Sequence, residues 1–486
     1  MTTPHPRVAA LTSPTAFRSH LASRGIDLDF DETVDVAALA RPLERTGTRV
    51  GNRFCILPME GWDGTHDGEP SDLTRRRWRN FGRSGAKLIW GGEATAVRPD
   101  GRANPNQLLI GERTLPGIAA LREELVAAHR ERFGAGADAD LFVGLQLTHS
   151  GRFARPGPGG APEPLVAHAN PVLDRRSAVP VRVIQDADLE RLAGQFVEAA
   201  RLAYRAGFAF VDVKSCHGYL GHELLSGRER PGPYGGDFRN RTRFLREVVS
   251  GIRSEVPQLQ VGVRLSVLDA VPFRSGPGGV GEPEVVGEGY PHAFGLIDDA
   301  DLEGSLAEPR RLLGELERLG VGWICASAGS PYYCPHVVRP ALFPPTDGYE
   351  PPEDPLRGVA RQIEAAARLK RAFPGLTLVG SAYSYLQEWI PHVAGRVLRE
   401  GKTDLVGLGR VTLSYPELPA DVLEGRPLAR KRLCRTFSDC TSGPRNGLVS
   451  GCFPLDPEYA RHPDAVRLKA VKAARRNASE AAKEAP

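Results

Sequence analysis

The sequence lacks the features that mark membrane, secreted and nucleic-acid-binding proteins. No apolar run approaches the roughly 20 residues that span a bilayer, and residues 1–18 hold no apolar core of a signal peptide. The net charge of +4, over 63 basic and 59 acidic residues, shows no excess of basic charge of the kind that binds nucleic acid. We therefore expect a cytoplasmic protein that acts on a small molecule, without membrane or nucleic-acid partners; a homo-oligomer stays open.

A disulfide framework is also missing. The seven cysteines are odd in number and scattered along a long chain, whereas disulfide-rich proteins are short and carry paired cysteines. Most of these thiols are therefore expected to be reduced. Three of them, Cys434, Cys440 and Cys452, gather near the C-terminus.

Short apolar runs alternate with amphipathic helical stretches from about residue 52 to about residue 425. Near-continuous Val, Ile and Leu are typical of strands buried on both faces of a parallel sheet. No GxGxxG turn directly follows any run, which disfavours a doubly wound open sheet. No internal repeat of fixed period is present. Eight strands that each precede a helix predict a (β/α)₈ TIM barrel. The eight runs are NRFCILPM, AKLIWGGEATA, LFVGLQLTH, FAFVDVKS, LQVGVRLSV, VGWICASAG, LTLVGSAYS and TDLVGLGRV.

The predicted barrel occupies residues 51–425. An N-terminal extension covers 1–50, and a Cys-containing C-terminal extension with a frayed helical or disordered tail covers 426–486. Residues 268–300 and 330–356 are rich in Gly and Pro and follow the fifth and sixth strands. Loops at this end of a barrel surround the active site, so we expect a lid that sets substrate choice, with plain surface excursions as the alternative. The helix over DADLERLAGQFVEAARLAYRAG is expected to begin at an Asp186 cap.

Glycine and a cation stand at the ends of the last two strands. Barrels commonly hold a phosphate between these two loops. Gly380 and Gly409 allow a phosphate to approach the backbone closely, and Ser381 follows the first of them. Arg410 has a planar guanidinium that can donate two hydrogen bonds to phosphate oxygens. We favour a phosphate site over an ordinary turn.

Two further strands end in polar side chains, Gln146 and Arg264. Burying an amide and a guanidinium at a barrel mouth is costly without partners. The pyrimidine edge of a flavin would supply them; a salt bridge for Arg264 and a backbone bond for Gln146 would serve equally well.

The fourth strand ends in Lys214, His217 and Tyr219. Two hydrogen-bond donors three residues apart can both donate to one carbonyl oxygen. They would stabilise the negative charge that develops on this oxygen as hydride arrives at the conjugated carbon. Tyr219 could then protonate the neighbouring carbon as a general acid. The cluster favours catalysis over three separately packed side chains.

In this order, NRFCILPM, EATAVRPDGR, LQLTHSGR, GFAFVDVKSCHGYL, YGGDFRNRTRFLREVV, VGVRLS and DLVGLGR resemble the successive signatures of the Old Yellow Enzyme family over about residues 45–425. The resemblance implies non-covalent FMN, reduced by NADPH or NADH, that passes hydride to an electron-poor alkene. It makes His217 part of the carbonyl-binding pair and Tyr219 the proton donor. It assigns to the flavin the residues Pro58, Met59, Glu60, Ala94, Gln146, Arg264, Gly380, Ser381, Gly409 and Arg410.

The sequence departs from this family at three places. Lys214 stands where the first member of the carbonyl-binding pair is usually histidine, and Glu60 where Thr or Cys usually tunes the flavin. A carboxylate there would disfavour an anionic reduced flavin unless it is protonated or turned away. The third departure is the short loop from Ser226 to Tyr234.

The three C-terminal cysteines test the longer branch of the family, which carries an iron–sulfur cluster and a second domain. Cys440 and Cys452 keep the last spacing of the cluster motif, but Leu433 and Thr436 occupy earlier ligand positions. We expect no cluster and no second domain; a zinc site or buried thiols are favoured.

The sequence thus predicts an FMN-dependent NAD(P)H oxidoreductase that reduces a C=C bond conjugated to a carbonyl, with no metal. An FMN-dependent oxidase or dehydrogenase of a biosynthetic pathway is the alternative. A flavin-binding barrel without turnover is disfavoured, because a site that performs no reaction does not require both His217 and Tyr219.

Overall fold

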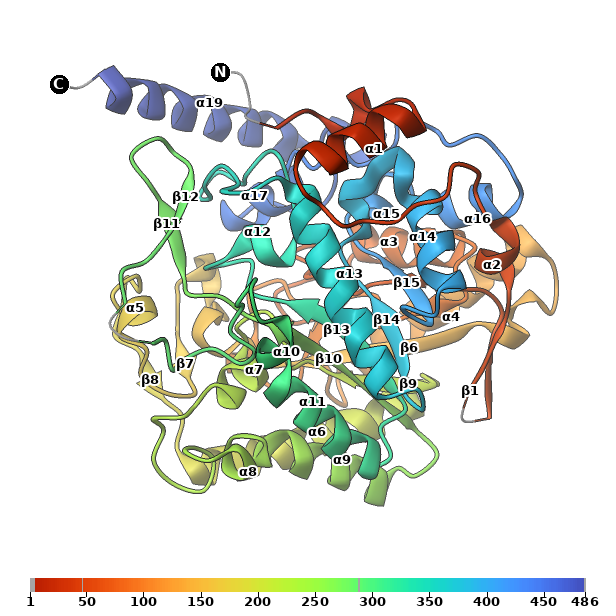
Figure 1. Cartoon of the computed structure of the whole chain (residues 1–486). Coiled ribbons are helices and arrows are strands. Elements are labelled where there is room, and N and C mark those ends of the chain that lie inside the picture. The colour runs from red at the N-terminus through yellow and green to blue at the C-terminus, as the bar shows by residue number, and fades with distance from the viewer. Residues whose placement is uncertain (1–4, 46, 287–288, 485–486) are drawn as a thin grey trace.

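A closed barrel of eight parallel strands forms the centre of the molecule (Figure 1), which confirms the predicted (β/α)₈ fold. The computed structural model describes residues 5–45, 47–286 and 289–484. Outside them lie 1–4 and 46 of the predicted N-terminal extension, 287–288 of the first predicted loop, and 485–486 of the predicted tail. Each apolar run contains one strand, the second of them interrupted. The strands are β3 (Phe54–Ile56), β4 (Leu88–Ile89) with β5 (Ala94–Ala96), β6 (Phe142–Thr148), β9 (Phe210–Val213), β10 (Gln260–Leu268), β13 (Trp323–Ala328), β14 (Thr377–Gly380) and β15 (Leu405–Leu408).

Helices surround the barrel and return the chain from one strand to the next, as parallel strands require. None of the described helices is long and apolar enough to cross a membrane. The surrounding helices are α3 (Asp72–Gly82), α4 (Leu115–Phe133), α6 (Asp186–Arg205), α9 (Arg243–Glu255), α11 (Ala307–Arg318), α13 (Pro355–Ala372), α14 (Ile390–Arg399) and the short α16 (Leu418–Leu423).

Helix α6 begins one residue earlier than expected. Its N-cap is Gln185, and Asp186 is the first helical residue, so the predicted Asp186 cap is wrong. The Asp186 carboxylate instead accepts a hydrogen bond from Arg230 at 2.5 Å. An acidic side chain in the first turn still stabilises the helix through its dipole.

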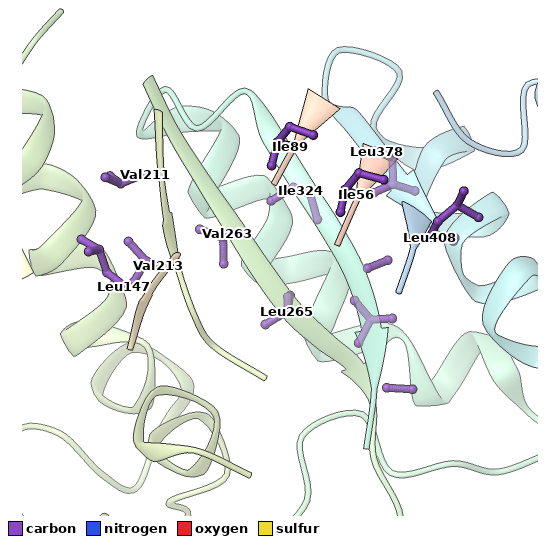
Figure 2. Close-up of a cluster of buried hydrophobic side chains, with 14 of the residues drawn as sticks. Ile56, Ile89, Leu147, Val211, Val213, Val263, Leu265, Ile324, Leu378 and Leu408 are labelled. Carbon is purple, nitrogen blue, oxygen red and sulfur yellow. The ribbon is translucent and has the colours of Figure 1, made fainter. Parts of the chain in front are cut away.

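Side chains alternate between the inside and the outside of the barrel, and this alternation places the site. Outward residues such as Ile56, Val211 and Leu265 belong to the large apolar layer between strands and helices, part of which Figure 2 shows. Inward residues form a separate cluster in which the Phe142 ring lies 4.7 Å from Phe210 and 4.9 Å from Trp323. Large rings therefore fill the amino-terminal half of the barrel, and the cavity opens at the carboxyl ends of the strands.

The two predicted loops lie against one another at that end. The first, residues 268–300, carries the hairpin of β11 (Phe273–Ser275) and β12 (Gly281–Pro283). The Phe273 amide donates to the Tyr333 carbonyl at 2.7 Å, and the Gly281 amide to the Glu350 carbonyl at 2.9 Å. The hairpin thus supports the second loop, residues 330–356, from outside.

The C-terminal segment (residues 426–484) also reaches this end of the barrel. It contains α17 (Asp439–Arg445), α18 (Pro457–Arg461) and α19 (Pro463–Glu484), and Figure 1 shows α17 near the helix α12 (Pro335–Val338) of the second loop. The Thr346 amide donates to Ser442 Oγ at 3.0 Å, and Arg445 pairs with Asp347 at 2.5 Å. The segment therefore packs on the second loop and closes one side of the barrel mouth.

Candidate active site

A cavity of about 320 Å³ opens at the carboxyl ends of the strands. It brings together eleven of the thirteen residues that the sequence singled out for catalysis or cofactor binding. Those eleven are Pro58, Met59, Glu60, Gln146, Lys214, His217, Tyr219, Arg264, Ser381, Gly409 and Arg410.

The other two, Ala94 and Gly380, are buried behind the cavity wall. The Ala94 carbonyl accepts a hydrogen bond from Gln107 at 2.9 Å. A Cβ added at Gly380 would lie 3.0 Å from both Thr403 Cγ2 and Tyr383 Oη. Both residues shape the wall, but neither lines the cavity.

Gln146 and Arg264 present unused polar atoms to the barrel interior. The Gln146 amide donates to Asp212 Oδ2 at 2.5 Å, and the Arg264 guanidinium donates to the Pro58 carbonyl at 3.0 Å. Burial raises the pKa of Asp212 to about 6. Arg264 Nε is buried with no partner in the described chain, and none of the described carboxylates pairs with Arg264 within 4.0 Å. The salt-bridge alternative for Arg264 thus has no support, and an acceptor on a bound molecule would satisfy the orphaned donor.

Two arginines with orphaned donors face the ends of β14 and β15. Arg410 donates to the Pro340 carbonyl at 2.8 Å through Nη2, while its Nη1 is buried without a partner among the described residues. Arg339, from the second loop, has an equally orphaned Nη2. Burial, with Arg445 and Arg410 nearby, lowers the pKa of Arg339 to about 9. Clustered cations with spare donors suit a phosphate group, and a Cβ at Gly409 would meet open space.

Glu60 links Lys214 and Tyr219 at the centre of the cavity. The Tyr219 hydroxyl donates to Glu60 Oε2 at 2.7 Å, and Lys214 Nζ donates to the same oxygen at 3.0 Å. Lys214 Nζ also lies 3.8 Å from the centre of the Tyr219 ring. Burial and the Glu60 charge hold the pKa of Tyr219 well above its usual value, so the phenol keeps its proton. Lys214 is therefore committed to Glu60 rather than free to act as a second histidine.

His217 stands in a strained turn at the end of β9. Its φ of 67° lies in the left-handed region, which costs a non-glycine residue about 1–3 kcal/mol. Its amide donates to Ser266 Oγ at 3.1 Å, and its carbonyl accepts from Ser330 Oγ at 2.8 Å. Burial, then Arg264 and Lys214, hold the pKa of His217 well below its usual value. The imidazole is thus neutral, with Nε2 2.9 Å from Ser327 Oγ.

An aromatic pair covers the cavity above Tyr219. The rings of Phe153 and Tyr332 stack with centroids 3.9 Å apart and an interplanar angle of 10°. The Tyr332 hydroxyl lies 3.1 Å from that of Tyr219, and the Arg445 guanidinium lies 5.3 Å from the centre of the Tyr332 ring. The pair gives the cavity a flat apolar wall suited to a planar ligand.

Sequence reasoning missed the wall that the C-terminal segment supplies. Cys440, Thr441, Pro444, Arg445 and Ser450 line the cavity. The second loop also lines it, whereas the described part of 268–300 does not. The C-terminal thiols are free, and no group of three or more His, Cys, Asp or Glu within the described residues is placed to hold a metal.

Arg77 fastens this wall to the barrel. It donates to Glu93 Oε1 at 2.6 Å and also contacts Asp63 and the Ser450 carbonyl. Tyr459 completes the network by donating to Asp63 at 3.0 Å. The side chains of Arg77, Asp63 and Glu93 are all at most 6% exposed, so this is a buried ion network between α3, the second strand and the C-terminal segment.

Comparison with known proteins agrees with this geometry. Residues 38–276 match the NADH:flavin oxidoreductase / NADH oxidase family. An NADPH dehydrogenase of Bacillus pumilus is 31% identical over 392 residues, which cover 79% of this chain and 94% of the relative. The chain belongs to this family. FMN is the cofactor of this flavin oxidoreductase and a nicotinamide its reductant, as the sequence predicted.

Two further likenesses show how far the resemblance extends. An NADH:flavin oxidoreductase of Gibberella zeae is 32% identical over 245 residues, and the matched part spans 56% of that protein. The old yellow enzyme homologue of Zymomonas mobilis has a TM-score of 0.56 and 20% identity, covering 80% of this chain and 94% of that one. At 20% identity the solved structure is evidence for the fold alone, and it agrees with the barrel that the sequence of this flavin oxidoreductase predicted.

Proposed function

We propose that this flavin oxidoreductase reduces a C=C bond conjugated to a carbonyl, with NADPH or NADH as reductant. The observation that carries the proposal is the cavity itself. One cavity holds a protonated phenol, Tyr219, and a neutral imidazole, His217, beside the orphaned donors of Arg264 and Arg410. We also propose that the protein is cytoplasmic and that its substrate is a small molecule.

The residues at the strand ends fit FMN. Arg410 and Arg339 offer buried donors for its phosphate, beside the open space at Gly409 and the Ser381 backbone. Gln146 and Arg264 would hold the pyrimidine edge, while Pro58 and Met59 lie beside it in the lining. Bound FMN supplies the hydride that is transferred between the nicotinamide and the alkene.

Three side chains prepare the substrate. Neutral His217 can donate one N–H to a carbonyl oxygen and stabilise the charge that develops there. Lys214, 3% exposed, adds positive charge close by while it stays paired with Glu60. Tyr219 gives its proton to the carbon next to the one that receives hydride. This assignment keeps Tyr219 and His217 in their predicted roles and moves Lys214 to a supporting one.

The oxidative alternative has one contact in its favour. The Tyr219 hydroxyl donates to an acceptor, Glu60, instead of pointing its proton at open space. A phenol oriented in this way could accept a proton from a substrate while Glu60 takes its own. Measuring both the reduction of an alkene and the oxidation of a saturated substrate therefore distinguishes the two directions of the reaction.

The proposed function predicts a yellow protein whose colour follows the reaction. Anaerobic NADPH or NADH should bleach the flavin absorption, and cyclohexenone or maleimide should restore it. A colourless protein that FMN cannot reconstitute would overturn the cofactor assignment. If neither nicotinamide bleaches the colour but a reduced substrate does, the oxidative alternative replaces the proposal.

Arg410→Ala should weaken FMN binding by about 10- to 100-fold. A hydrogen bond to a charged group contributes about 1.5–3 kcal/mol, and each 1.4 kcal/mol is about tenfold in Kd. Flavin fluorescence during dilution of the holoprotein measures the Kd. Arg426→Ala is the matched control, because Arg426 pairs with Asp421 at 2.6 Å outside the cavity. Equal Kd values for both variants would remove Arg410 from the phosphate site.

A further inference from the structure

The strained turn at His217 and Gly218 is held by side chains from three other elements. Both residues are left-handed, with φ values of 67° and 77°. Ser266 Oγ of β10 and Ser330 Oγ of the second loop bind the two polar backbone atoms of His217. The Gly218 amide donates to Nδ1 of His222, at 2.9 Å. His222 lies on α7 (Leu220–Leu225) and is 2% exposed, so the third support of the turn comes from a buried histidine.

The bond from the Gly218 amide fixes the position of the proton on His222. Burial lowers the pKa of His222 to about 4, so the ring is neutral at physiological pH. A neutral imidazole carries one proton, and Nδ1 can accept a hydrogen bond only when that proton is on Nε2. Nε2 is buried without a hydrogen-bond partner in the described part of the chain, and it lies 3.8 Å from Asp269 Oδ2. The N–H of His222 therefore faces a carboxylate.

Asp269 joins the two predicted loops behind this histidine. It directly follows β10 and forms a bridge with Leu296 near the end of the first loop. Its carboxylate accepts hydrogen bonds from the Tyr333 hydroxyl at 2.9 Å and from the Ala270 amide at 2.8 Å. Burial raises the pKa of Asp269 to about 7, while these donors favour its ionised form. One buried carboxylate thus contacts the residue next to Tyr332 of the cavity wall and faces the histidine that supports the turn.

We propose that His222 is a positioning residue that keeps His217 in its substrate-binding conformation, and that Asp269 orients His222. This inference rests on the proposed role of His217 as a hydrogen-bond donor to the substrate carbonyl. Neither His222 nor Asp269 lines the cavity, so both act through the turn. Without the Nδ1 acceptor, the buried Gly218 amide loses its partner, and the left-handed turn becomes less populated. The apparent affinity for a carbonyl ligand falls in proportion to that population.

Three replacements of His222 separate the roles of its two ring nitrogens. Asparagine carries an amide oxygen as many bonds from the backbone as Nδ1, glutamine reaches the position of Nε2, and leucine supplies neither. The change in flavin absorption on titration with cyclohexenone gives the Kd of the oxidised holoprotein, measured above the pKa of Asp269. In His222→Leu and His222→Gln this Kd should rise about 10- to 100-fold. His222→Asn should recover most of the affinity.

Hydrogen exchange of the Gly218 amide provides a second measurement, which needs neither ligand nor turnover. Mass spectrometry of the peptide that contains Gly218 should show loss of protection in His222→Leu and His222→Gln. In His222→Asn the protection should remain, because the amide keeps an acceptor. His222→Gln and His222→Asn both place a polar side chain at this buried position, so their comparison holds even if the leucine variant fails to fold.

His129→Leu is the matched control. His129 is also buried and hydrogen-bonded through both ring nitrogens, to Gly82 and Lys87, but it does not line the cavity. Its replacement should lower stability and leave the Kd for cyclohexenone unchanged. If His222→Gln keeps the wild-type Kd, or if His222→Asn binds as weakly as His222→Gln, His222 does not position the turn.

Two further variants test the other parts of the proposal. Asp269→Asn should also weaken binding, and combined with His222→Leu it should add no further loss; additive losses would remove Asp269 from the proposal. His217→Ala tests the role on which the proposal rests. If His217→Ala keeps the wild-type Kd while the Gly218 amide still loses protection in His222→Gln, the proposed role of His217 fails and the support of the turn by His222 stands.

Discussion

Replacing Tyr219 with phenylalanine is expected to slow alkene reduction by about 10²–10⁴-fold, the usual contribution of a general acid. The side chain is 1% exposed and its ring packs beneath Lys214 at 3.8 Å, so phenylalanine fills the same space. Only the hydroxyl is lost, and with it the proton. Reduction of the flavin by NADPH should stay nearly unchanged, because that half-reaction needs no proton from Tyr219.

Stopped-flow measurement of each half-reaction separates these effects. The control is Tyr234→Phe, which removes a hydroxyl that donates to Glu247 at 2.7 Å outside the cavity. It should lose about 1 kcal/mol of stability and no activity. Equal slowing of both half-reactions in Tyr219→Phe would mean that the phenol holds the cofactor and does not deliver a proton.

The fold could be predicted because barrel strands carry a strong signal. Val211 and Val213 face the helices while Phe210 fills the inside, so β9 carries apolar residues on both faces, and seven other runs share this character. A few polar residues interrupt the apolar runs, as Gln146 does in β6 and Arg264 in β10. These polar positions could therefore be recognised as site residues, and eleven of the thirteen predicted site residues line one cavity.

The rest of the site depends on contacts between segments that are distant in the sequence. Arg339 lies 71 residues before Arg410 along the chain, and only the closed barrel brings both near one cavity. Arg445 and Thr441 come from a segment that attracted attention for its cysteines alone. The Gly- and Pro-rich composition of 330–356 was a usable signal for Arg339, whereas nothing in the sequence distinguished Arg445 from the other arginines.

Lys214 and Glu60 show how two departures from a family pattern can have one cause. Taken singly, the lysine in place of histidine appeared to alter the carbonyl-binding pair, and the glutamate in place of Thr or Cys appeared to disfavour an anionic reduced flavin. The structure pairs them at 3.0 Å, so each charge neutralises the other, and a buried lysine without a partner would be costly. A single replacement at either position should therefore disturb the site more than the two together, a coupling that a double-mutant cycle measures.

Arg77→Met is expected to reduce the free energy of unfolding by about 3–5 kcal/mol, the cost of removing one partner from a buried ion pair. Asp63 and Glu93 would stay buried without their counter-charge, and Ser450 would lose its donor. The midpoint of urea unfolding measures the loss. Because Arg77 fastens the C-terminal segment, that segment should also become the first site of cleavage in limited proteolysis.

Arg76→Met is the matched control, since the neighbouring Arg76 also joins α3 to the C-terminal segment, through Asp456 at 2.8 and 2.9 Å. Its side chain is 32% exposed, so its loss should cost only about 0.2–1 kcal/mol. Adding Asp63→Asn and Glu93→Gln to Arg77→Met should recover part of the stability, because the uncompensated charges disappear. Equal losses from Arg76→Met and Arg77→Met, without recovery in the triple variant, would show that packing and not buried charge holds the segment to the barrel.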